Sequence, residues 1–140
     1  MQANFMDRFD FRKRVAYYPE QKRLFHQNAR RQLQKLAAAL GFKPGEYDVR
    51  SNKGGIAVSG EVILHADRLY VQASQPATGS NTGLLFRSCE GRRDYVGGPN
   101  HFASLDLLHE PAALATLIRW HCSPRTPDQV RGGLRSGVAP

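Results

Sequence analysis

The sequence has no long apolar run, because Ser, Glu, His or Arg interrupts each apolar stretch within a few residues. A membrane-spanning helix needs about 20 consecutive, mostly apolar residues, so no membrane partner is expected. Cysteine is also scarce, since Cys89 and Cys122 are too few for a disulfide framework. The first residues lack the basic and apolar segments of a secretory signal. These absences predict a cytoplasmic protein with two reduced thiols.

Motifs for metals, cofactors and phosphate loops are absent as well. The sequence has no Cys-x-x-Cys pair and no histidine pair with a spacing of four residues. The glycine-containing loops at 51–55 and 97–100 do not match a phosphate-binding loop set between a strand and a helix. We therefore expect neither a metal nor a cofactor, and no motif names a reaction.

Acidic residues are rare in the first third of the chain. Residues 1–43 hold ten Lys or Arg but only three Asp or Glu, whereas the remainder holds ten basic and nine acidic residues. The first segment thus contributes +7 of the formal net charge of +8. Such an asymmetry is typical of a surface that binds a polyanion or an acidic protein.

The arrangement of apolar residues predicts a helix, several strands and a second helix. One apolar stripe (25, 29, 33, 36, 37 and 40) indicates an amphipathic helix over 20–40, which Gly41 ends. A second helix is expected over 111–122, after a turn of helix over 104–108 that Ser104 caps. Five segments with strand character lie between them: 46–50, 56–65, 69–74, 84–89 and 92–96. Gly60 indicates a bulge or a close approach by another backbone.

The fold class that follows is α+β in two layers. An N-terminal amphipathic basic helix precedes an antiparallel meander of three to five strands, and a C-terminal helix packs on one sheet face. We expect a basic aromatic arm over 1–18, a single domain over 19–122 and a flexible tail over 123–140. A length of 140 residues suits one such domain.

The polar face of the first predicted helix is basic and contains no acid after Glu20. A surface helix usually mixes both signs of charge, because Glu–Lys pairs one turn apart stabilise it. Glutamines add hydrogen bonding for phosphates without cancelling the charge. The expected binding residues on this helix are Arg23, Gln27, Arg30, Arg31, Gln34 and Lys35. The alternative is a solvated polar face that happens to be basic.

The arm adds Arg12, Lys13 and Arg14 beside Tyr17 and Tyr18. Cations interleaved with aromatic rings are common on nucleic-acid-binding surfaces. Alternatively, the aromatic residues of the arm pack onto the core and carry their basic neighbours along.

A second polar cluster runs from Arg87 to His101. Glycines there permit close approach of a ligand, and arginines can bind phosphate or carboxylate. The residues of this expected secondary anion site are Lys53, Arg87, Arg92 and Arg93. The alternative is turn chemistry alone, with Asp94 pairing to an arginine beside it.

The leading hypothesis is a small, basic, non-catalytic protein that binds nucleic acid, DNA or RNA, or is associated with a nucleoprotein complex. Phosphate contacts of the basic helix predict weak sequence specificity and strong salt dependence. One alternative is a protein-interaction module, an accessory or inhibitory factor that docks on an acidic protein or a nucleoprotein complex. A second is a small hydrolase-like enzyme that uses Glu61 and His65, or the 87–101 cluster, for acid–base chemistry.

Overall fold

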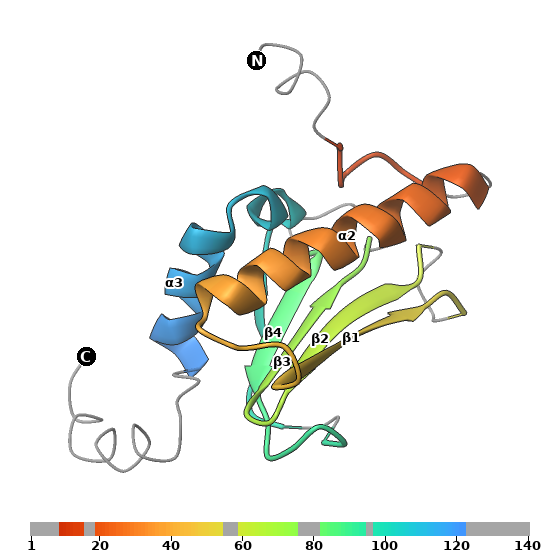
Figure 1. Ribbon diagram of the computed structural model, residues 1–140. Helices are drawn as coiled ribbons and strands as arrows, with labels where there is room; N and C mark the ends of the chain where they lie inside the picture. Colours follow the sequence, from red (N-terminus) through yellow and green to blue (C-terminus); the bar gives the residue numbers. More distant parts are fainter. Residues whose placement is uncertain (1–8, 16–18, 55–58, 76–81, 95–96, 123–140) are drawn as a thin grey trace, which may run out of the picture.

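A computed structural model describes residues 9–15, 19–54, 59–75, 82–94 and 97–122 (Figure 1). Helix α2 (Pro19–Ala39) comes first. Five strands follow it along the chain: β1 (Tyr47–Asn52), β2 (Glu61–Ala66), β3 (Leu69–Ala73), β4 (Leu84–Ser88) and β5 (His101–Ala103). The 3-10 helix η1 (Leu105–His109) and helix α3 (Pro111–Cys122) end the described chain.

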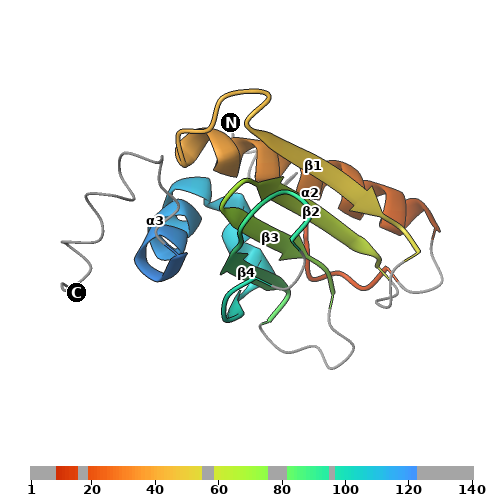
Figure 2. The same cartoon turned by 90° about the horizontal axis from the view of Figure 1, so that it is seen from below.

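The five strands form one antiparallel sheet in the order β1-β2-β3-β4-β5. Each strand pairs with the next along the chain, as short connections require. Helices α2 and α3 lie on the same face of the sheet, and the strands form the second layer (Figures 1 and 2). The α+β, two-layer class expected from the sequence is therefore confirmed.

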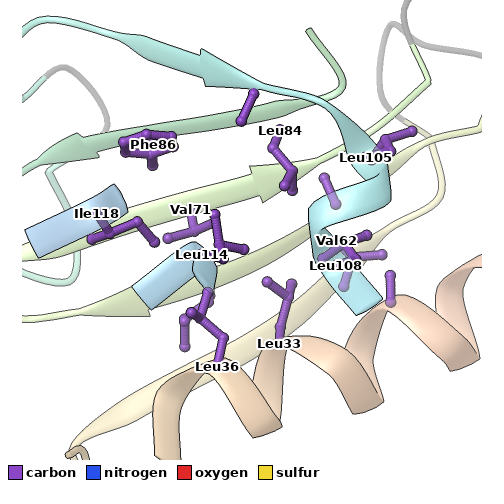
Figure 3. Packing of buried hydrophobic residues seen from close by; sticks show 14 of the residues in the cluster. Leu33, Leu36, Val62, Val71, Leu84, Phe86, Leu105, Leu108, Leu114 and Ile118 are labelled. Atoms are coloured by element: carbon purple, nitrogen blue, oxygen red, sulfur yellow. The ribbon is translucent and has the colours of Figure 1, made fainter. Parts of the chain in front are cut away.

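The core lies between α2 and the sheet, where the apolar stripe of the helix packs on the apolar face of the strands. Leu33 and Leu36 face inward from α2, and Val62 and Val71 face them from adjacent strands (Figure 3). All four side chains are fully buried. Burying such a side chain contributes about 1.5–3 kcal/mol. This packing fixes α2 in one rotation about its axis, and so determines which of its residues face solvent.

The helix boundaries follow from local chemistry. Gly41 takes a positive φ of 88°, so it can end α2 in a left-handed turn. The Ser104 side chain accepts a hydrogen bond from the Asp106 amide, which caps η1 as expected. Pro111 opens α3, where its missing amide hydrogen costs no hydrogen bond.

Residues 9–15 pack against the domain. Phe11 is 1% exposed and Val15 is 2% exposed. The buried Gln75 amide donates to the carbonyls of Phe11 and Lys13, at 2.9 and 2.6 Å, and its oxygen accepts from the Val15 amide. This part of the expected arm therefore shares the core with the rest of the domain. Residues 1–8 and 16–18, and the expected tail at 123–140, lie outside the described residues.

One predicted strand is wrong and another element was missed. Residues 92–94 form a turn, in which the Asp94 amide donates to the Gly91 carbonyl at 3.1 Å. The fifth strand is instead His101–Ala103, which pairs with β4. Gly91 lies against the sheet face opposite α2, because its carbonyl bonds the side chain of His65, which alternates with core residues of β2.

Candidate nucleic-acid interface

The outward side of α2 carries polar side chains that the core packing leaves in solvent. They lie opposite the buried stripe of the helix and come from positions three or four residues apart. We call the exposed ones the α2 face: Arg23, Gln27, Arg31, Gln34 and Lys35. The helix as a whole contains five Lys or Arg and one acid, so its formal net charge is +4.

Arg23 is held along the helix by Glu20. Its Nε donates to Glu20 Oε1 at 3.1 Å and its Nη2 to Oε2 at 2.5 Å, while Nη1 donates to Gln27 Oε1 at 3.0 Å. The hydrogen bond and charge of Arg23 lower the pKa of the Glu20 carboxyl, which is fully exposed. Glu20 therefore stays ionised at neutral pH and competes with any phosphate for this guanidinium.

Arg31 and Lys35 are the least constrained cations of the α2 face. Arg31 makes a long contact of 3.4 Å from Nη1 to Asn28 Oδ1. Lys35 is exposed and makes no hydrogen bond or ion pair with the described residues. The charged groups of both side chains can bind an anion without breaking a contact that the fold needs.

Arg30, which the sequence also places among the binding residues, contacts the edge of the sheet. It is half-buried, and its Nη1 donates to the Val49 carbonyl at 3.0 Å and lies 3.4 Å from Ser51 Oγ. Val49 belongs to β1, which is an edge strand of the sheet. An edge strand presents unpaired backbone groups that invite pairing with another chain, and a charged side chain blocks this. Arg30 thus protects the sheet edge.

Within residues 9–15, Arg12 forms an ion pair with the 3-10 helix η1. Arg12 Nη1 lies 3.1 Å from Asp106 Oδ2 in an exposed ion pair. Lys13 and Arg14 are exposed. Tyr17 and Tyr18, the aromatic half of the expected pattern, lie outside the described residues.

The four members of the expected secondary anion site do not converge. Lys53 follows Asn52, which pairs with Glu61 at the start of β2. Arg87 lies in the row of His65 and Tyr70, near the other end of that strand. Lys53 is thus separated from Arg87 by most of the length of β2.

Arg92, Arg87 and Arg93 also differ in what they contact. Arg92 lies 3.1 Å from Asp67 and 3.6 Å from Asp48, and it donates to the Gly45 carbonyl at 2.8 Å. Arg87 is buried with its guanidinium 4.0 Å from the centre of the Tyr70 ring. Arg93 is exposed. Arg92 thus ties the turn at 92–94 to β1 and to the turns that hold Asp67 and Gly45.

The proposed acid–base pair is not assembled. Glu61 and His65 stand at opposite ends of β2, and Glu61 lies 3.4 Å from the Asn52 amide group. His65 is fully buried. Its Nδ1 accepts from Arg50 at 3.1 Å, since a guanidinium can only donate, and its Nε2–H donates to the Gly91 carbonyl at 3.0 Å. His65 therefore joins β1, β2 and Gly91 as a neutral imidazole.

A second buried histidine, His26, ties α2 to the start of β2. Its Nε2 donates to the Ser59 carbonyl at 2.7 Å. Its Nδ1 is buried and has no hydrogen-bond partner among the described residues. Burial lowers the pKa of both imidazoles; Arg50 and Arg87 add to the effect at His65, and Lys53, Lys22 and Arg30 at His26. The carbonyl contacts and Asp94, which raise the pKa, do not reverse this direction.

These two histidines make the fold sensitive to acid. In the unfolded chain each protonates near its ordinary pKa of about 6.5. Because the folded-state pKa is lowered, the free energy of unfolding has its full value above about pH 6.5. It decreases as the pH falls from there toward the folded-state pKa. Between these limits the free energy of unfolding should fall by up to about 1.4 kcal/mol per pH unit for each histidine.

Urea unfolding at neutral pH and at roughly one unit below the ordinary histidine pKa measures this effect. His65→Gln removes one of the two titrations, so its free energy of unfolding should depend less steeply on pH, whatever its absolute stability. The same stability at both pH values in the unmodified protein would contradict the expectation.

The described residues offer no group of three His, Cys, Asp or Glu that could hold a metal ion. Burial raises the pKa of the Cys89 thiol, and it raises that of Cys122 to about 11. Both thiols are therefore protonated and weakly nucleophilic at neutral pH. In the part of the chain that is described, neither α2 nor α3 is long and apolar enough to span a membrane.

Comparisons with protein-family models, curated proteins and solved structures find no match to this chain. Function is therefore inferred from the geometry and charge of the described residues alone.

Proposed function

We propose that this protein binds nucleic acid, without catalysis, through the α2 face. The observation that carries the proposal is an exposed helix side with cations at Arg23, Arg31 and Lys35, and with Glu20 as the one acid of the helix. Backbone phosphates are the partner that such a face fits best, since arginine forks and carboxamides both donate hydrogen bonds to phosphate oxygens. The two free thiols, Cys89 and Cys122, fit a reducing, cytoplasmic setting.

The number of cations on the α2 face limits how steeply the affinity for nucleic acid can fall with salt. Each neutralised phosphate of a DNA duplex contributes about −0.9 to the slope of log affinity against log salt. Three cations on the α2 face therefore give a slope of about −2.7 at most, and affinity should fall by up to roughly 40-fold between about 50 and 200 mM salt.

A fluorescence-polarisation titration against single- and double-stranded DNA and RNA at these two salt concentrations tests the proposal. Dissociation constants of about 10⁻⁴ to 10⁻⁶ M are the expected range for such sequence-independent binding. Absence of binding at the lower salt concentration, or an affinity that salt does not change, would overturn it.

A second candidate function is docking on an acidic protein, and one observation favours it. Trp120 of α3 is 67% exposed, and exposed tryptophan is a frequent anchor of protein interfaces. Its neighbour Arg119 donates to the Ala39 carbonyl at 2.7 Å, so this end of α3 lies against the end of α2. An apolar anchor beside a basic face would suit such a partner. This function predicts a saturable protein complex that Trp120→Ala weakens, together with negligible affinity for nucleic acid.

A further inference from the structure

The side chains of the α2 face are sorted by their angle around the helix. At 100° per residue, Gln27, Arg31 and Gln34 fall within an arc of about 60°, at the centre of the exposed side. Arg23 and Lys35 lie at the two margins of this side, about 120° apart. Between residues 23 and 35 the outward centre of α2 therefore holds two carboxamides and one guanidinium, with one cation on each flank. Glu20, the acid of the helix, falls at the same central angle about one turn before Arg23.

This arrangement matches the cross-section of a DNA groove. An α-helix with its side chains is about 10–12 Å across, and the major groove of B-form DNA is about 12 Å wide with a phosphate backbone on each side. A helix lying in that groove directs its central side chains at base edges and its marginal side chains at the two backbones. From Arg23 to Lys35 the helix rises about 18 Å, which corresponds to about five base pairs.

We propose that the nucleic acid is B-form duplex DNA and that α2 lies lengthwise in its major groove. This proposal rests on the proposed function and names its substrate class. Marginal Arg23 and Lys35 contact phosphates, while Gln34, Arg31 and Gln27 face the bases. Glutamine pairs with adenine and arginine with guanine at their major-groove edges. Phosphates still supply most of the affinity, and the carboxamides add a preference among sequences.

Other nucleic acids fit this side of the molecule less well. The major groove of duplex RNA is deep and too narrow for side chains to read. Single strands are bound mainly by stacking their bases on aromatic rings. Among the described residues the exposed large apolar side chains are Phe102 and Trp120, and neither belongs to α2. No described element packs over the outward side of α2, which runs along the surface of the helical layer (Figure 1).

The first experiment compares four probes: a DNA duplex, an RNA duplex of the same sequence, the single DNA strand, and a DNA duplex carrying glucosylated hydroxymethylcytosine, which fills the major groove. The unmodified DNA duplex should bind about 10-fold tighter than the RNA duplex and the glucosylated duplex. A minor-groove ligand such as netropsin should leave the affinity nearly unchanged.

Equal affinity for DNA and RNA duplexes, unaffected by glucosylation, would overturn groove docking while leaving the proposed function in place. Binding to none of the probes would overturn both.

The second experiment tests the carboxamides without altering charge. The unmodified protein should enrich a short sequence from a pool of random DNA duplexes. The variant Gln27→Ala/Gln34→Ala should enrich none, while its affinity for the unselected pool stays within about 3-fold, because the phosphate contacts remain. The matched control is Gln32→Ala, a half-buried glutamine of the same helix off the α2 face, which should keep the preference. Enrichment of the same sequence by the double variant would overturn the assignment of these two residues.

Discussion

Combined replacement of Arg31→Glu and Lys35→Glu is expected to weaken nucleic-acid binding about 100-fold at low salt, because two cationic contacts with the nucleic acid are lost and two repulsions replace them. Helix α2 holds five Lys or Arg and one acid, so the double variant leaves it with a formal net charge of zero. Fluorescence polarisation against duplex DNA measures the loss. An unchanged affinity would contradict the proposed function.

The same variant should keep its thermal midpoint, which makes the test specific. Neither side chain is buried, and the one hydrogen bond between them and the described residues is the 3.4 Å contact of Arg31 with Asn28. Exposed substitutions of this kind change stability by about 0.5 kcal/mol or less. Arg30 is left out because it covers the edge of β1, so its replacement would mix a folding defect with a binding defect.

A matched control reverses the same amount of charge elsewhere. Arg68 lies in the turn between β2 and β3, and Arg93 lies in the turn at 92–94; both are exposed. Arg68→Glu/Arg93→Glu should weaken binding only a few-fold, through the change in net charge alone. An equal loss in both double variants would show that net charge, and not the α2 face, drives binding. It would also implicate Arg93 and the expected secondary anion site.

Neutralising Glu20 should act in the opposite direction. Glu20→Gln removes the carboxylate that holds the Arg23 fork, so Arg23 gains freedom to contact phosphate. We expect tighter binding, by about 3-fold, and a salt slope closer to the limit of about −2.7 that three fully engaged cations set. Glu110→Gln, which neutralises an exposed acid just before α3, serves as the control for the change in net charge. Weaker binding by the Glu20 variant would mean that the fixed orientation of Arg23 is what the ligand needs.

The long periodic elements of this fold can be predicted from the sequence, and the short ones cannot. Helix α2 was expected over 20–40 and helix α3 over 111–122, because an apolar stripe several turns long leaves few alternatives. Strand β5 has three residues, which is too short to show a period. The turn at Arg92–Asp94 depends on where Arg92 meets Asp67 and Gly45, and these partners come from distant parts of the sequence.

The candidate site likewise contains residues whose position the sequence predicts and residues whose position depends on tertiary contacts. Helical spacing alone places Gln27, Arg31, Gln34 and Lys35 on one side of α2, because these positions need no tertiary contact to be exposed. The role of Arg30 could not be predicted, since it depends on β1 lying beside α2. The burial of His65 could not be predicted either: alternation in a strand suggests one solvent-facing side, but Gly91 contacts His65 on that side.

Gly60→Ala is expected to lower the free energy of unfolding by about 3 kcal/mol or more. Gly60 has a φ of +73°, a conformation that costs alanine about 1–2 kcal/mol. An added Cβ would also lie 2.5 Å from the Asn52 carbonyl oxygen and 2.9 Å from Lys53 Cα. The close backbone approach expected from the sequence is thus present, and it leaves no room for a methyl group.

Two other glycines separate the cost of a positive φ from the cost of the steric clash. Gly41 has a φ of +88° with nothing within 4 Å of the Cβ position, and Gly91 has open space without a positive φ. Urea unfolding should therefore show a loss of about 1 kcal/mol for Gly41→Ala and nearly none for Gly91→Ala. An effect of Gly60→Ala no larger than that of Gly41→Ala would contradict the clash.

Gly60 also connects stability to the α2 face. The added Cβ would lie 3.0 Å from His26 Nε2, the atom that joins α2 to the Ser59 carbonyl. Lys22 Nζ donates to the Lys53 carbonyl at 2.6 Å. Helix α2 is therefore bonded to both backbone segments that meet here, at Ser59 and at Lys53. Pushing Asn52 and Lys53 away should loosen the first half of the helix before its second half, whose Leu33 and Leu36 remain in the core. Amide hydrogen exchange should then accelerate selectively in the first half of α2. Uniform acceleration across the helix would mean that the contacts of Lys22 and His26 do not anchor this half.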